Sequence, residues 1–241
     1  MQYNFDLGII FQEQYFNLLV SGFSTTILLT LTSLLLAFFV GSVLTGLRLT
    51  GWWIADKFVA VYVAFHRNVP MVVHILFWYF GVAALLPQSV TNWLYDHNAE
   101  FLMAMIAIGL VGSAYISEDL RSAVRSIPAG QTEAARALGL NYISTLRRII
   151  LPQAFRIAVP PLVSQTVLMF KNTSLAMAIG VLELTAAGRE IENYTFKTFE
   201  IYVVITVFYL VFSLLIMWGG SVLAHRYSTV VRTDPASVKA G

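Results

Sequence analysis

The sequence contains no cysteine and few charged residues, and each shortage narrows what the protein can be. Without cysteine the chain forms no disulfide, no thiolate metal site and no cysteine nucleophile. Only 12% of the residues are charged, against about 25% in a typical soluble domain, while 58% are hydrophobic. A chain of 241 residues cannot bury that much apolar surface in one core, so lipid is the expected solvent. A net charge of only +2 argues against a nucleic-acid-binding protein.

Two further absences concern the start of the chain and its phosphate chemistry. Residues 1–20 contain no Lys or Arg, whereas a secretory signal peptide needs a basic first region. We therefore expect the first hydrophobic segment to remain in the mature protein. The chain also has no G-x-x-x-x-G-K-[ST] phosphate-binding loop, so we expect no nucleotide hydrolysis by such a site.

Hydrophobic stretches long enough to cross a bilayer, for which roughly 20 apolar residues suffice, occur five times. They cover residues 18–47, 57–86, 101–122, 159–182 and 202–224. Pro70 interrupts the second stretch and predicts a kink or a break there. Pro160 and Pro161 lie at the start of the fourth stretch and are expected to open its helix. Residues 1–17 mix apolar and polar side chains, which predicts a segment lying along the outer membrane surface.

The distribution of Lys and Arg favours one orientation in the membrane. One predicted face carries Arg48, Lys57, Arg67, Arg121, Arg125, Arg136, Arg147, Arg148, Arg156, Arg226, Arg232 and Lys239. The loops of the other face carry only Arg189 and Lys197. Because cytoplasmic loops are enriched in Lys and Arg, the N-terminus is expected outside and the C-terminus, including a tail at 229–241, in the cytoplasm.

A polar, basic segment at residues 121–160 interrupts the apolar composition. After a turn, residues 132–138 favour a helix, and Gly139 permits the positive φ that closes a helix. A second helix is expected over residues 142–151, with a bend at Pro152. By composition alone, this segment is an ordinary basic cytoplasmic loop.

The spacing within this segment is more informative than its charge. A Glu-Ala-Ala triplet is followed after three residues by glycine, after nine more by isoleucine, and after one more by Leu-Pro. The positions are Glu133, Ala134, Ala135, Gly139, Ile149, Leu151 and Pro152. They match every fixed position of the EAA signature, so the chain resembles the permease subunits of ATP-binding cassette (ABC) importers. The chain also resembles the polar amino acid permeases at residues 114–118, 126–131, 156–161, 170–175 and 179–180. In all, the resemblance covers about residues 22–227.

The resemblance implies an all-α integral membrane protein with the type I ABC importer permease fold. Its transmembrane domain would cover residues 18–228, with five transmembrane helices and a cytoplasmic coupling helix within residues 121–158. That helix would dock on a separate ATPase, which binds the ATP and Mg²⁺; no cofactor, metal or catalytic residue is expected in this chain. The implied partners are a second, related permease chain, two ATP-binding subunits and an extracytoplasmic solute-binding protein. The implied location is the bacterial inner membrane.

Polar residues within the spans are candidates for a substrate path, because charge in a bilayer is costly and usually faces protein or water. The candidates are Arg67, Asn68, Glu118, Lys171, Asn172, Thr173 and Ser174. Lys171 lies mid-span and needs a carboxylate partner, either Glu118 or a carboxylate of the substrate.

Simpler roles are open for several of these residues. Arg67 and Asn68 also fit an anchor and a cap beside the Pro70 break. His74 is expected to be a hydrogen-bonded interior histidine rather than a metal ligand, since no second histidine lies at ligand spacing. Asp119 is expected to pair with a nearby arginine.

Two departures from related permeases bear on the cargo. Many relatives carry Lys-Asp-Thr-Ser where this chain has Asn172 after Lys171, which removes a negative charge. The chain also has Arg-Asn-Val-Pro at 67–70 in place of the commoner Arg-Gly-Thr-Pro. With these two departures the chain most resembles the glutamate/aspartate importers. Glutamine, histidine and arginine are the alternative cargoes.

Two other classes of protein compete with this interpretation. A gradient-driven transporter or channel would explain Lys171 and Glu118 in the membrane but not the EAA spacing. A membrane-embedded enzyme would need a nucleophile–base or metal constellation, and the spans show no such pattern.

Overall fold

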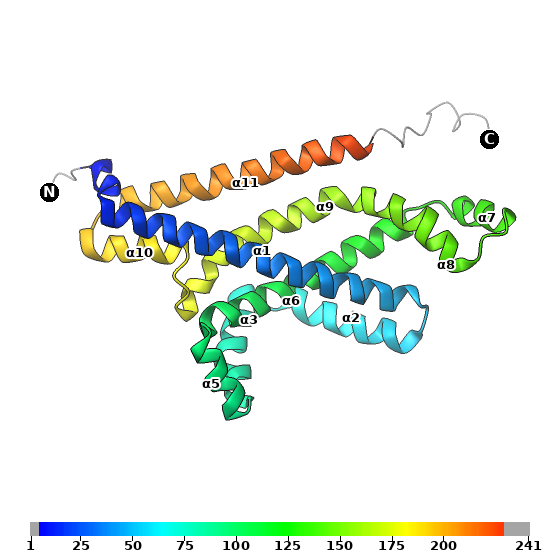
Figure 1. The fold of residues 1–241 in the computed structure, drawn as a ribbon, viewed down its shortest axis with the longest axis horizontal. Helices are drawn as coiled ribbons and strands as arrows, with labels where there is room; N and C mark the ends of the chain where they lie inside the picture. The colour runs from blue at the N-terminus through cyan, green and yellow to red at the C-terminus, as the bar shows by residue number, and fades with distance from the viewer. Residues whose placement is uncertain (1–4, 229–241) are drawn as a thin grey trace.

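The computed structural model describes residues 5–228, and every regular element within that range is helical (Figure 1). Three helices are long and apolar enough to cross a membrane alone: α1 (Glu13–Leu49), α6 (Ala99–Arg125) and α11 (Thr198–Ser228). Two pairs of helices, each bent at a break, would make two further spans if each pair counts as one. One joins α2 (Trp53–Asn68) to Met71–Leu85 at 108°, and the other joins Tyr142–Ile179 to α10 (Leu184–Thr195) at 50°. The all-α prediction is confirmed.

Shorter elements connect the long ones. They are η1 (Leu7–Phe11), α3 (Met71–Leu76), η2 (Phe77–Val82), α4 (Ala83–Leu85), α5 (Gln88–Asp96), α7 (Ala129–Ala137), α8 (Tyr142–Thr145), η3 (Leu146–Ile150), α9 (Leu151–Asn172) and η4 (Thr173–Ile179). Figure 1 shows α7 and α8 at one end of the long axis and α10 with the start of α1 at the other. The long helices run between these two ends. The polar segment at residues 127–152, called the polar knob below, therefore lies far from the N-terminal segment.

The core is built on close contact between α1 and α6, where small residues let the backbones approach. A Cβ added at Gly41 would meet the Ile116 side chain at 3.0 Å. The buried hydroxyl of Thr45 donates to the carbonyl of Ser117 at 3.2 Å, so polar groups also link the two helices.

The break predicted at Pro70 is confirmed. Helix α2 ends at Asn68, Val69 is extended, and α3 begins at Met71. Proline lacks an N–H and disfavours helical backbone in the residue before it, which accounts for the end of α2 at this point.

The helix start expected at Pro160 and Pro161 was predicted wrongly. Pro160 and Pro161 lie inside α9, which begins at Leu151, rather than opening a helix. Pro152 lies in the first turn of α9, directly after the π-helical segment η3 (Leu146–Ile150), so the helix is irregular where the bend was expected. The helix simply continues out of the apolar stretch, because backbone hydrogen bonding does not stop where hydrophobicity does.

The N-terminal segment, which was expected to lie along the membrane surface, does not form one continuous helix. Residues 7–11 form η1, Gln12 is extended, and α1 begins at Glu13. Residues 1–4 and the expected tail at 229–241 lie outside the described residues.

Candidate functional site

The first helix of the polar knob, α7, ends in a well-defined turn. Helix α7 ends in the Schellman arrangement. The N–H of Gly139 donates to the Arg136 carbonyl at 2.9 Å, and the N–H of Leu140 donates to the Ala135 carbonyl at 3.0 Å. Gly139 has a φ of +78°, which L side chains rarely adopt. The glycine of the signature therefore sets the direction in which the chain leaves α7.

The signature residues divide between the surface and the interior of the knob. Ala135 is buried and Ile149 is half-buried, so these two pack the knob together. The exposed ones are Glu133, Ala134, Gly139, Leu151 and Pro152. Only these exposed positions are free to contact another protein.

Apolar side chains at the end of the knob were missed by the sequence analysis. Leu138 is 80% exposed and Ile143 is 73% exposed, because no element among residues 5–228 covers them. The same segment also carries exposed arginines: Arg125, Arg136, Arg147, Arg148 and Arg156. Large apolar side chains within a charged rim are typical of a protein contact surface.

The knob is anchored to the membrane helices rather than hinged freely on them. The hydroxyl of Tyr142 donates to the Leu49 carbonyl at the end of α1, at 3.1 Å. Next to this contact, Arg48 and Arg121 both bind the Glu118 carboxylate. Asp56 accepts a further ion pair from Arg48 at 3.3 Å. This cluster, formed by Arg48, Asp56, Glu118 and Arg121, joins α1, α2 and α6.

Glu118 and Lys171 are not brought together. The Glu118 carboxylate is engaged by two arginines, and Lys171 is exposed and makes no ion pair within the described part of the chain. The structural alternative for Lys171, a Glu118 partner, is therefore contradicted. The reason is that the two side chains belong to different helices, whose faces the sequence does not reveal.

The two breaks in the spanning helices do lie together. Helix α3, which follows the Pro70 break, contacts η4, which follows Lys171 and Asn172. Helix η4 is a 3₁₀ segment that ends at Gly180 with a φ of +95°. Broken helices that meet within a membrane expose backbone polar groups, and such places often form transport sites.

The candidate polar residues line this region unequally. Arg67 is exposed, with its guanidinium carbon 4.9 Å from the centre of the Tyr115 ring. Asn68 donates to the Ala64 carbonyl at 2.7 Å, so it caps the end of α2. Thr173 is buried and donates to its own helix, at the Phe170 carbonyl. Ser174 likewise donates to the Lys171 carbonyl, and Asn172 is half-buried.

Asp119 and Gln165 form a polar contact between α6 and α9 that the sequence analysis did not identify. Gln165 interacts with the Asp119 carboxylate, and Arg67 is the positive charge that acts on Asp119. The second carboxylate oxygen of Asp119 and the amide oxygen of Gln165 are buried without a hydrogen-bond partner among the described residues. The expected arginine is thus near Asp119 but makes no direct ion pair with it.

Two further interior features complete the site. His74 is buried, as expected, but neither of its ring nitrogens has a hydrogen-bond partner among the described residues; its ring lies parallel to that of His66 at a centroid distance of 5.2 Å. Glu183, which the sequence analysis passed over, is fully buried before α10. It accepts hydrogen bonds from the N–H groups of Thr185 and Ala186 and from the Tyr209 hydroxyl, each at 2.9 Å. Glu183 thereby caps α10 and ties it to α11.

Comparison with known proteins adds a family and several relatives. The family model for the binding-protein-dependent transport system inner membrane component matches residues 38–229. The chain is 32% identical to the glutamate/aspartate import permease protein GltJ of Escherichia coli K12, over 90% of this chain and 92% of that protein. It is 37% identical to the glutamine transport system permease protein GlnP of E. coli K12, over 83% and 88%. A solved amino acid ABC transporter with histidines superposes with a TM-score of 0.81 at 25% identity, covering 94% of this chain and all of that one.

Proposed function

Because this chain belongs to the family of binding-protein-dependent transport system inner membrane components, we propose that it is a permease subunit of an ATP-driven amino acid importer, with glutamate and aspartate as its cargo. The exposed surface of the polar knob is the main support for this proposal. It presents Glu133, Ala134 and the apolar Leu138 and Ile143 at one end of the molecule, on a helix whose exit is set by Gly139. A separate ATPase would bind this surface and move it.

The knob is suited to transmit motion because it is attached to the spans at two points. Helix α8 continues through η3 into α9, which leads to η4. Tyr142 holds the knob to the end of α1. A displacement of α7 would therefore reach the contact between η4 and α3, where the helices are broken. This is the place we assign to the substrate path.

The assembly that we propose contains more than this chain. Permeases of this family work with ATP-binding subunits and a solute-binding protein. We assign the ATP and Mg²⁺ to two ATP-binding subunits, and we place a related second permease beside this one. In the proposed topology the N-terminus lies outside, five spans cross the inner membrane, and the C-terminus lies in the cytoplasm, as the arginine-rich knob favours.

Positive charge without an added carboxylate supports an acidic cargo. Lys171 and Arg67 are both exposed, on either side of the α3–η4 contact, and position 172 is Asn. Glutamine is the second candidate, supported by the similarity to a glutamine permease. The two cargoes differ in charge, because only glutamate carries a second carboxylate that Lys171 or Arg67 can bind.

The test is transport by the chain reconstituted in liposomes with its co-purified ATPase, second permease and binding protein. We expect uptake of labelled glutamate that requires ATP inside the liposome and that unlabelled aspartate competes. Uptake that an ion gradient drives without ATP would refute the importer and favour a secondary transporter. Competition by glutamine alone would retain the importer and change its cargo.

The role of Lys171 is tested in the same liposomes. Lys171→Met removes the charge and keeps most of the stem, whereas Lys171→Arg keeps the charge. If Lys171 binds a substrate carboxylate, the methionine variant should raise the KM for glutamate by roughly 10- to 150-fold, since a charge-assisted hydrogen bond is worth roughly 1.5–3 kcal/mol. Arginine should restore most of the affinity. Equal kinetics for both variants would remove Lys171 from the path.

A further inference from the structure

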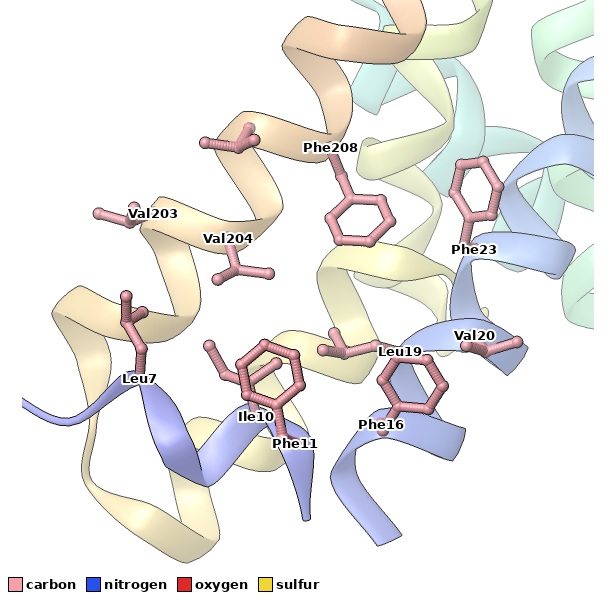
Figure 2. A pocket seen from close by; sticks show the side chains of 11 residues that line it. Leu7, Ile10, Phe11, Phe16, Leu19, Val20, Phe23, Val203, Val204 and Phe208 are labelled. Atoms are coloured by element: carbon pink, nitrogen blue, oxygen red, sulfur yellow. The ribbon is translucent and has the colours of Figure 1, made fainter. Parts of the chain in front are cut away.

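An apolar groove separates α1 from α11 near the end of the molecule where α1 begins. Figure 2 shows its walls: Phe16 and Phe23 from α1, Val203 and Phe208 from α11, and Leu7 and Phe11 from η1. The groove has a volume of about 430 Å³, and all the residues that line it are apolar. It is not part of the proposed substrate path, which lies at the α3–η4 contact.

Specific contacts hold the two walls together at both ends of the groove. At its deep end Phe23 meets Phe208 and Phe212, with ring centroids 5.8 and 4.3 Å apart. At its shallow end η1 is held to α11 because the fully buried carboxylate of Glu200 accepts the N–H of Asp6 at 3.0 Å. The walls are therefore fixed, and the gap between them is a built feature of the fold.

Its surroundings limit what can fill it. Both walls are helices long and apolar enough to cross a membrane, and the lining offers water no hydrogen-bond partner. One turn of helix with its side chains fills roughly 400–600 Å³, judging from its pitch and diameter. The groove therefore holds about one helical turn at most, whereas a spanning helix needs roughly 20 residues. A flexible hydrocarbon chain can follow a groove of this size.

The charges beside the groove favour one kind of headgroup. Asp6 and Glu13 are exposed next to η1 and at the start of α1, and both are negative. The nearby cation Lys197 lies 3.6 Å from the Glu200 carboxylate, which already offsets its charge. The end of the groove thus attracts an ammonium group and repels an anionic headgroup.

We propose that the groove binds one acyl chain of a phospholipid with an ammonium headgroup, in the leaflet where α1 begins. The bound chain fills the space between α1 and α11. Phosphatidylethanolamine has the required chemistry, and phosphatidylglycerol with the same acyl chains is the matched anionic lipid.

The experiment places the full-length protein, with its co-purified partners, in nanodiscs containing equal amounts of the two lipids. Native mass spectrometry then counts the lipids that remain after release into detergent. Val207→Trp fills the groove with an indole ring, and Val211→Trp, one turn further along the exposed face of α11, is the control. We expect retained phosphatidylethanolamine to fall at least several-fold in Val207→Trp and to stay unchanged in Val211→Trp. Equal retention in the two variants would refute the site.

Two further measurements test the identity of the occupant. Glu13→Lys should preserve lipid retention but shift it towards phosphatidylglycerol; an unchanged preference would refute the headgroup assignment. Replacing Phe11, an aromatic lining residue that is 77% exposed, with photoreactive benzoylphenylalanine should cross-link lipid in the nanodisc without filling the groove further. A cross-link to another protein chain in place of lipid would show that the groove is a protein interface and that the proposal is wrong.

Discussion

At the scale of single residues, the roles of neighbouring charges depend on which helix face they occupy. Glu118 and Asp119 are adjacent in the chain, yet Glu118 binds Arg48 and Arg121 whereas Asp119 faces Gln165 on α9. Consecutive residues on a helix point about 100° apart, so one joins an ion cluster and the other an interhelical contact. The Glu118 side chain is 17% exposed and that of Arg48 is 8% exposed, which makes the pair largely desolvated.

The ion cluster predicts a stability difference between two carboxylates. Glu118→Gln should lower the free energy of unfolding by about 1–3 kcal/mol, because it leaves two arginines without their shared anion. Asp56→Asn is the control in the same cluster. The Asp56 side chain is 58% exposed, so its loss should cost less than about 1 kcal/mol. Thermal unfolding of the purified protein in one detergent measures both; equal midpoints would mean that Glu118 does not hold the cluster.

At the scale of elements, the breaks and turns matter more than the helices themselves. Long apolar helices form wherever lipid excludes water, because each backbone group must find a partner within its own segment. The points at which helices end, namely Pro70, Gly139 and Gly180, direct the chain into the contacts that carry the proposed function. Helix η4 and α3 meet only because both of their helices are interrupted.

The turn after α7 predicts a coupling defect. Gly139→Ala should strain a residue with φ +78° by about 1–2 kcal/mol, which corresponds to a roughly 5–30-fold lower population of the native knob geometry. Gly130→Ala is the matched control, since Gly130 lies inside α7 and an added Cβ has no neighbour within 4 Å. We expect fewer glutamate molecules imported per ATP hydrolysed in Gly139→Ala, with normal membrane insertion. If Gly130→Ala is equally impaired, the positive φ is not the cause.

At the scale of the whole molecule, the knob and the start of α1 lie at opposite ends of the long axis (Figure 1). The proposed topology assigns these two ends to opposite sides of the membrane, and their separation agrees with that assignment. Much of the outward surface of α11 is apolar, with only 11% of its spanning window buried inside this chain. Lipid and the partner permease would cover that surface in the assembled transporter.

The absence of cysteine makes the topology directly testable. Leu138→Cys lies on the knob, where the native leucine is 80% exposed, and Tyr194→Cys lies near the end of α10, where the tyrosine is 69% exposed. A membrane-impermeant maleimide should label Tyr194→Cys in intact spheroplasts and Leu138→Cys only after the membrane is opened. The reverse pattern would invert the proposed orientation, and labelling of both from outside would exclude it.

The sequence by itself determined the helical class, the membrane setting, the Pro70 break and the glycine turn that ends α7. Each depends on local chemistry: apolar composition, a missing N–H, or a φ that only glycine adopts easily. The EAA spacing identified the knob for the same reason, since its residues are close together in the chain.

Only the tertiary structure decided which distant residues meet. It paired Glu118 with Arg48 and Arg121, set Asp119 against Gln165, and brought α3 to η4. It also carried α9 through Pro160 and Pro161 and opened the groove between α1 and α11. In an all-apolar helix every face suits lipid, so hydrophobic pattern no longer tells which face is inside. The choice of partner then depends on side-chain shape and on the few polar groups that must be satisfied across helices.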